Sequence, residues 1–328
     1  YARWQGSFSA VMLFTLQPGV FSDNAYWLTT ALTLLPLLLG TGMLLRQLGK
    51  MLHAPRTMVV LIFLALMTLS IQLVPDLNQT FYWFNGGCYY TFYYALSLML
   101  LTGTLRICTD GKCRAGRTAL CMLLAFFIGG RNYTTILVTL ILLMLLLFAL
   151  LVRKNPAWRQ ILLVMVALLT AFAINAAAPG NRVRAATIPR SMDAVPAILY
   201  SFDRAWVRVS GYFGWPQGIA IALFALLMWD FVGQCGLKFR FPLLKSALAY
   251  AIFSAQMTPS LFAMANVGPG RQIDIYYYAY GWLLLCWTFL WVGWLRNSSV
   301  GTKIDAALSH LTRNSAAIAA ALSLALVL

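Results

Sequence analysis

Long apolar runs separated by short polar breaks dominate the chain. The run 136–152, ILVTLILLMLLLFALLV, contains a single polar side chain, Thr139. The run is continuous rather than alternating, which favours a helix with apolar surroundings over a strand with one polar face. Since about 20 mainly apolar residues cross the hydrocarbon core of a bilayer, such runs predict membrane spans. We predict spans at 25–45, 57–74, 88–105, 118–130, 133–152, 160–178, 217–232, 243–264, 275–295 and 315–328.

The run 118–130 is short and stops at GGRNY, residues 129–133. Together with 133–152 it indicates either two closely joined helices or a re-entrant segment. We treat it as a span because the polar breaks then alternate consistently between the two sides of the membrane.

Composition supports several spans. The chain has 328 residues, of which 61% are hydrophobic and 10% are charged, far from the balance of a soluble domain. We therefore predict an all-α, polytopic transmembrane protein with about 10 spans, folded as a single membrane domain over 1–328. Because the sequence starts at Tyr1 without a methionine and stops inside an apolar run, we expect a fragment truncated at both ends.

Basic residues concentrate in five of the breaks, near Arg46, Arg106, Arg153, Lys238 and Arg296. The positive-inside rule assigns these breaks to the cytoplasm of a multi-pass protein of the cell (inner) membrane. The opposite, external or periplasmic face then receives residues 1–24, 75–87, 129–132, 179–216 and 265–274.

The charges differ in kind between the two faces. All six lysines fall on the predicted cytoplasmic face, whereas the external basic residues are all arginine: Arg3, Arg131, Arg182, Arg184, Arg190, Arg204, Arg208 and Arg271. Topology and anionic lipid account for the cytoplasmic excess, so we expect the lipid bilayer and no nucleic acid as its partner. A guanidinium is a planar fork suited to phosphate. We predict phosphate binding by Arg3, Arg131, Arg182, Arg184, Arg190 and Arg271; the alternative is pairing with aspartates or snorkelling to lipid.

The longest external connection, 179–216, is predicted to hold an amphipathic helix in the membrane interface. Its apolar positions recur at helical spacing: Val195, Ile198, Leu199, Phe202, Trp206, Val209 and Phe213. Asp203, Arg204 and Arg208 fall on another face.

Aromatic residues crowd two other external segments. The stretch PDLNQTFYWFNGGCYYTFYY, 75–94, sets Asn85-Gly86-Gly87 among nine aromatics, and Gly268-Pro269-Gly270 precedes Arg271 at the base of an aromatic-rich helix. Aromatic faces stack on sugar rings, although a plain aromatic belt would share this composition. The predicted sugar contacts are Trp4, Trp83, Asn85 and Tyr277.

The available side chains limit the chemistry. All eight acidic residues are aspartates, and both histidines fall on the cytoplasmic face, so an external zinc site or Ser-His-Asp triad lacks material. The sequence has no phosphate-cradling Gly-Lys-Ser/Thr loop for ATP. We expect no cofactor and no metal ligand cluster, and leave a divalent cation open.

An aspartate that activates a hydroxyl, beside arginines that neutralise a phosphate leaving group, fits the residues. The candidate catalytic bases are Asp23, Asp76 and Asp274.

Three stretches, YARWQGSFSAVM, FYWFNGGCYYTF and NAAAPGNRVR, together with the architecture, resemble the GT-C superfamily of integral membrane glycosyltransferases. The likeness is to bacterial enzymes that decorate surface polysaccharides or teichoic acids. It implies transfer of a sugar from a polyprenyl-phosphate donor to a cell-envelope glycan acceptor on the external face. The family's acidic base in the first external loop would precede Tyr1, and Asp23 is the acid that remains in that region.

Two other functions stay open. A polysaccharide polymerase or ligase acting on lipid-pyrophosphate-linked glycans would also use external arginines. A flippase or transporter of lipid-linked sugars would place ionisable groups at mid-span and often shows inverted repeats. The sequence has almost no mid-span charge and no visible repeat, which disfavours transport.

Overall fold

The computed structural model describes residues 6–110, 114–188, 190–301, 303–304, 321–322 and 325–326. Within these residues every regular element is a helix, which confirms the predicted all-α class. The longer helices are α3 (Leu28–Leu52), α4 (Arg56–Gln72), α6 (Thr91–Thr109), α7 (Arg114–Gly129), α8 (Tyr133–Val152), α9 (Trp158–Ala176), α11 (Ala194–Tyr212), α12 (Trp215–Gln234), α13 (Pro242–Ala255) and α15 (Gly270–Arg296). Short helices connect them: α1 (Phe8–Phe14), α2 (Pro18–Phe21), η1 (Asp23–Ala25), η2 (Asn78–Tyr82), α5 (Phe84–Tyr89), α10 (Pro179–Ala185) and α14 (Thr258–Met264).

In the described part of the chain, seven helical segments are long and apolar enough to cross a membrane: Asp23–Leu52, Phe84–Thr109, Tyr133–Val152, Trp158–Ala176, Trp215–Gln234, Pro242–Met264 and Gly270–Arg296. They agree with a multi-pass membrane protein. The number is below the predicted ten because α4 and α7 have only 17 and 16 residues. The last predicted span, 315–328, lies mostly outside the described residues.

The chain divides into two compact units. Unit 1 comprises 1–47, 75–204 and 254–275, and unit 2 comprises 48–74, 205–253 and 276–328. The domain expected over 1–328 therefore contains two centres of packing, which we describe separately.

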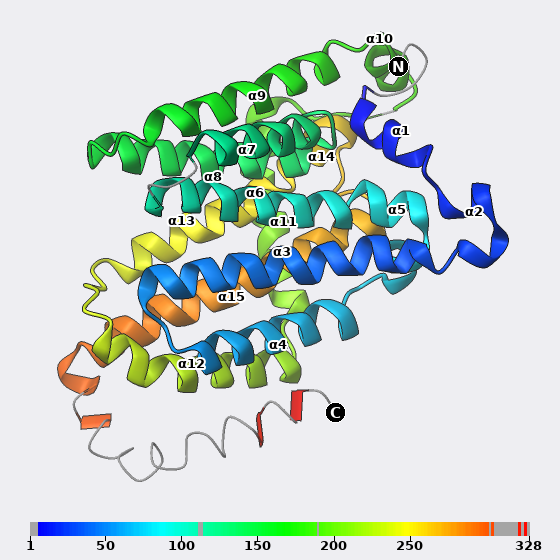
Figure 1. Cartoon of the computed structure of the whole chain (residues 1–328). Helices are drawn as coiled ribbons and strands as arrows, with labels where there is room; N and C mark the ends of the chain where they lie inside the picture. The colour runs from blue at the N-terminus through cyan, green and yellow to red at the C-terminus, as the bar shows by residue number, and fades with distance from the viewer. Residues whose placement is uncertain are drawn as a thin grey trace. The chain divides into compact units, whose positions relative to one another are not determined.

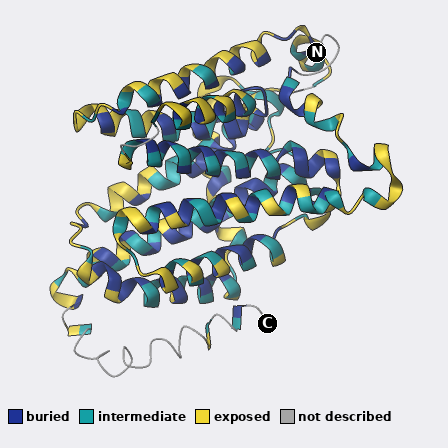
Figure 2. Cartoon of the chain, viewed as in Figure 1, coloured by how far each residue is buried: buried dark blue, intermediate teal, exposed yellow. Residues whose placement is uncertain are grey.

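Four helices form the centre of unit 1. In Figure 1, α6, α7, α8 and α9 lie side by side. The approach of α7 to α9 is close, since a Cβ on Gly129 would lie 2.4 Å from the backbone oxygen of Leu168. Leu143 and Ile161 are fully buried in this core, while Phe148 and Leu163 are exposed. Buried and exposed stripes along one helix, as on α9 in Figure 2, suit a bundle with lipid around it.

Unit 2 contains α4 and α12, which pack against each other. Arg296 at the end of α15 lies with its guanidinium carbon 5.5 Å from the ring of Trp229. Toward the N-terminus of the same helix, Tyr277 is buried and accepts a hydrogen bond of 2.8 Å from Gln217 Nε2. Its ring meets that of Tyr212 edge-on, at 5.0 Å between centroids.

Two helix boundaries differ from the prediction for local reasons. The predicted span 243–264 is interrupted between α13 and α14, where Pro259 stands in the first turn of α14. Proline disfavours helical backbone in the residue before it and fits the first turn of a new helix. The predicted span at 88–105 begins earlier, with α5, and is interrupted at Tyr90 before α6.

The predicted interfacial segment 179–216 contains α10 and the 19-residue helix α11. Large apolar side chains on α11 are exposed, among them Leu199 and Trp206. The buried residues of this helix are small or of medium size: Ala197, Ser201, Ala205 and Val209. Val209, predicted on the apolar lipid-facing side, belongs instead to this buried stripe, because residues four apart share one helix face.

Candidate functional site

Segments distant in sequence meet at one end of unit 1. The backbone N–H of Gly6 donates to Asn181 Oδ1 at 2.9 Å, and Asn132 Nδ2 donates to the backbone oxygen of Tyr89 at 3.3 Å. We call this end the arginine end and define it by residues 6–14, 75–90, 129–134, 175–185 and 265–275. It unites most of the segments that the charge pattern assigns to the external face.

An aspartate pair lies at the centre of the arginine end. Asp274, in the second turn of α15, is fully buried. One carboxylate oxygen accepts the backbone N–H of Asp76 at 2.9 Å, and the other accepts the hydroxyl of Thr80 at 2.5 Å. Asp274 thereby holds the chain at Asp76 and the π-helix η2 in place. π-Helical turns are rare and occur often at functional sites.

Asp76 is only partly buried and faces a second set of polar groups. Gln79 donates to both carboxylate oxygens of Asp76, through its backbone N–H at 3.1 Å and its side-chain Nε2 at 2.5 Å. Arg271 donates to Gln79 Oε1 at 3.0 Å, and its guanidinium carbon lies 5.0 Å from the ring of Trp83. Gly270 allows the first turn of α15 to lie against Asp76, since a Cβ on Gly270 would lie 2.5 Å from Asp76 Oδ2. The result is a carboxylate, a cation and an aromatic face in one network.

Arg131, between α7 and α8, is fully buried. Its guanidinium carbon lies 3.0 Å from the ring centroid of Tyr89, 4.6 Å from that of Tyr93 and 5.5 Å from that of Tyr90. Within the described part of the chain, Nε, Nη1 and Nη2 have no partner at good hydrogen-bond geometry, and Tyr89 contributes only a weak hydrogen bond. Burial lowers the pKa of Arg131 to about 10, and the tyrosines offset part of the effect. The group therefore stays charged at neutral pH.

Tyr90 connects the arginines of this end. Its ring centroid lies 5.9 Å from the guanidinium carbon of Arg271, compared with 5.5 Å for Arg131. The charge of Arg184 acts on Tyr90 as well, and on Tyr133. Arg131 and Arg271 thus lie against the same ring, and an anion here would meet a positive field to which Arg184 adds.

Two asparagines position the stretch NAAAPGNRVR. Asn175, buried at the end of α9, donates to the backbone oxygen of Arg131 at 2.6 Å. Asn181 donates to the backbone oxygen of Asn175 at 2.7 Å and to the hydroxyl of Tyr133 at 3.3 Å. These bonds fix the loop that carries Arg131 and the start of α10, on which Arg184 lies.

Gln272 joins α15 to two other helices. Its Nε2 donates to Thr134 Oγ1 at 2.8 Å and to Ser260 Oγ at 2.5 Å, and all three side chains are buried. Thr134 lies in the first turn of α8, three residues beyond Arg131. Gln272 therefore links the helix that carries Arg271 to the segment that carries Arg131.

Other predicted site residues lie apart from this network. Asp23 is exposed in η1, and Asn85 is exposed in α5. Arg182 and Arg190 are exposed as well. Tyr277 belongs to unit 2 and is buried. Arg3 and Trp4 lie outside the described residues.

Sequence reasoning missed the uncharged polar residues that hold the site together: Gln79, Thr80, Asn175, Asn181 and Gln272. A signal was present for some of them, since Asn175 and Gln272 adjoin apolar spans in which an unpaired amide would be costly. Within the described residues no three His, Cys or Asp side chains gather in a metal-binding arrangement. The polar groups here could hold an anion through arginines 131, 184 and 271.

Comparison of the chain with protein-family models, with curated proteins and with solved structures found no match.

Proposed function

We propose that the chain is a membrane glycosyltransferase of GT-C type. It would transfer a sugar from a polyprenyl-phosphate-linked donor to a glycan of the cell envelope, on the external face of the inner membrane. The observation that carries this proposal is the network of Asp76, Gln79, Arg271 and Trp83, supported from behind by Asp274. It combines the base, the cation and the sugar-stacking face that the reaction needs.

Asp76 is the best candidate for the base. Asp274 is fully buried with both oxygens engaged, so an acceptor cannot reach it, whereas Asp76 is partly exposed. The acceptor hydroxyl would attack the anomeric carbon of the donor while Asp76 takes the hydroxyl proton. The bond between the anomeric carbon and the phosphate oxygen breaks, and its electron pair leaves with the polyprenyl phosphate.

Arg271 and Arg184 are the groups best placed to neutralise that leaving phosphate. Arg271 is aligned by Gln79, and both charges act on Tyr90. Arginine charge that is already in place before the reaction stabilises a developing anion without reorganisation. Trp83, 42% exposed beside Arg271, would present its face to the sugar.

The test is the variant Asp76→Asn, which keeps the shape of the side chain and removes the base. We expect transfer from a panel of polyprenyl-phosphate monosaccharides to fall by about 10²- to 10⁴-fold. Asp110→Asn, an exposed aspartate elsewhere in unit 1, is the matched control and should leave transfer unchanged. Full activity of Asp76→Asn would refute the assignment. Turnover of oligosaccharide-pyrophosphate lipids alone would point to a polymerase or ligase.

Sidedness needs a separate measurement. Asn85 at the arginine end and Lys154 between α8 and α9 are both exposed. In a background with the native cysteines replaced, Asn85→Cys should react with a membrane-impermeant maleimide on intact cells. Lys154→Cys should react only after the membrane is opened. The reverse pattern would place the arginine end in the cytoplasm and contradict external transfer.

A further inference from the structure

Arg131 is the described arginine whose position is hardest to explain by folding alone. Its side chain is fully buried, its three guanidinium nitrogens meet no partner at good hydrogen-bond geometry among the described residues, and the hydrogen bond with Tyr89 is the smallest of the interactions that support its charge. Burying a charge without strong hydrogen bonds is costly, and contacts with aromatic faces offset only part of that cost. The guanidinium N–H groups of Arg131 can therefore still donate strong hydrogen bonds to an oxyanion.

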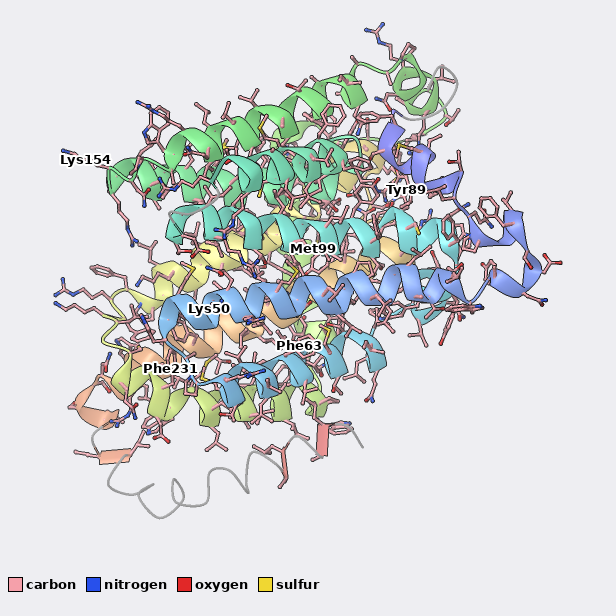
Figure 3. The ribbon with its side chains drawn as sticks, in the orientation of Figure 1. Lys50, Phe63, Tyr89, Met99, Lys154 and Phe231 are labelled. Carbon is pink, nitrogen blue, oxygen red and sulfur yellow. The ribbon has the colours of Figure 1, made fainter. Side chains whose placement is uncertain are left out.

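The three rings around Arg131 differ in how firmly they are held. Tyr93 is fully buried and Tyr90 is nearly so, whereas Tyr89 is partly exposed. Tyr89 also makes the closest approach, 3.0 Å from its ring centroid to the guanidinium carbon. Tyr89 therefore covers Arg131 on the side that is nearest to the surface. Tyr89 itself lies beside α1 (Figure 3).

A hydrogen bond ties this cover to the start of α1. The hydroxyls of Tyr89 and Ser7 lie 2.7 Å apart, and Ser9 Oγ donates to the backbone oxygen of Gly130 at 2.9 Å. The helix α1 has only seven residues, and its other face carries exposed Val11 and Met12. A short helix with one packed face opens at low cost compared with the core helices.

We propose that Arg131 is the anchor of a phosphate subsite and that Tyr89, latched to Ser7, is its cover. When the ring of Tyr89 moves aside, the guanidinium binds two phosphate oxygens through parallel N–H bonds. The guanidinium carbon of Arg271 lies 5.9 Å from the ring of Tyr90, which Arg131 also contacts, so the subsite suits a multiply charged phosphate better than a carboxylate. The sugar-transfer proposal assigns no role to Arg131, and this inference stands on binding alone.

The experiment measures equilibrium binding to the purified full chain in detergent, with geranylgeranyl phosphate as the probe. We expect the wild type to bind this probe and not to bind geranylgeraniol, which lacks the phosphate. Inorganic phosphate should compete with the probe and displace it. Arg131→Gln should weaken binding by about tenfold or more, the usual loss for a charge-assisted hydrogen bond. Equal binding of geranylgeraniol, or wild-type affinity in Arg131→Gln, would overturn the subsite.

The latch is tested by Tyr89→Phe, which keeps the ring over Arg131 and removes the hydroxyl. Association with geranylgeranyl phosphate should become about threefold to tenfold faster, since a hydrogen bond contributes about 1 kcal/mol. Ser7→Ala should give the same change, and the double variant should give no more. Unchanged rates in both single variants would overturn the cover. These variants also keep the test decisive if Arg131→Gln fails to fold.

One further variant separates this inference from the proposed reaction. Asp76→Asn, which should end transfer, is expected to bind geranylgeranyl phosphate no more weakly than the wild type. Loss of transfer with binding intact supports both proposals. Transfer retained by Asp76→Asn together with weak binding by Arg131→Gln would refute the base and support the subsite.

Discussion

The two ends of unit 1 use basic residues in opposite ways. At the end formed by residues 47, 104–110, 114–118 and 150–159, Arg117 pairs with Asp110 at 2.9 Å while both side chains keep a third to a half of their exposure. Lys154 points away from the protein there (Figure 3). At the arginine end, Arg131 is fully buried and Arg271 is partly buried beside Gln79.

The difference is one of cost. An exposed ion pair contributes about 0–1 kcal/mol, so a chain gains or loses little by having one. A buried guanidinium costs several kcal/mol, roughly, unless anions or hydrogen bonds offset the lost hydration. Because the fold bears this cost at the arginine end and avoids it at the other, the arginine end is where we propose that transfer takes place.

The largest contrast is expected between two arginines that each face a glutamine. Arg271 donates to Gln79 at 3.0 Å, and Arg106 donates to Gln47 at 3.4 Å. Arg271→Ala should lower transfer by about 10²-fold or more, since removal of one preorganised donor costs about 3–4 kcal/mol. Arg106→Ala should leave transfer unchanged. Equal effects in the two variants would remove the distinction between the ends.

A smaller effect is expected from the two buried glutamines. Gln272 donates to Thr134 and Ser260, and Gln47 donates to Thr109. Replacing each by methionine keeps the volume and removes the hydrogen bonds, at about 1–3 kcal/mol of stability. Gln272→Met should also raise the KM for the lipid donor, because Arg271, the residue before Gln272, is then held less firmly against α8 and α14. Gln47→Met should change stability alone, as measured by thermal unfolding beside steady-state kinetics.

The smallest effect is expected from the exposed pair. Arg117→Ala removes the ion pair with Asp110 and should change the free energy of unfolding by less than about 1 kcal/mol. Transfer should be unaffected. A loss of activity comparable to that of Arg271→Ala would show that the opposite end also takes part in the reaction.

Much of the local structure was predictable from hydrophobic periodicity. Nine of the ten predicted spans coincide with helices or helix pairs, the tenth lying mostly outside the described residues. The interruption between α13 and α14 follows from Pro259, a signal that the apolar run hid. The position of α11 along the chain was also correct, whereas its buried stripe was not predicted, because small residues such as Ala197 give a weak hydrophobic signal.

The site was predictable as a set of candidates. Charge sorting selected Asp76, Asp274 and Arg271, which the structure brings together, and also Asp23, which it leaves exposed. Sequence alone offered no way to rank them, because a carboxylate in a polar break looks the same whether it ends up exposed or buried.

By itself the sequence determined that this chain forms apolar helices and that one set of its polar breaks carries arginine without lysine. Those properties depend on side chains within a few turns of each other, so local composition suffices. Only the tertiary structure decided that Asp76 meets Asp274 from 198 residues away, and that Arg131 is enclosed by tyrosines. Such contacts depend on how distant helices pack, and hydrophobic periodicity carries no information about which polar ends will meet.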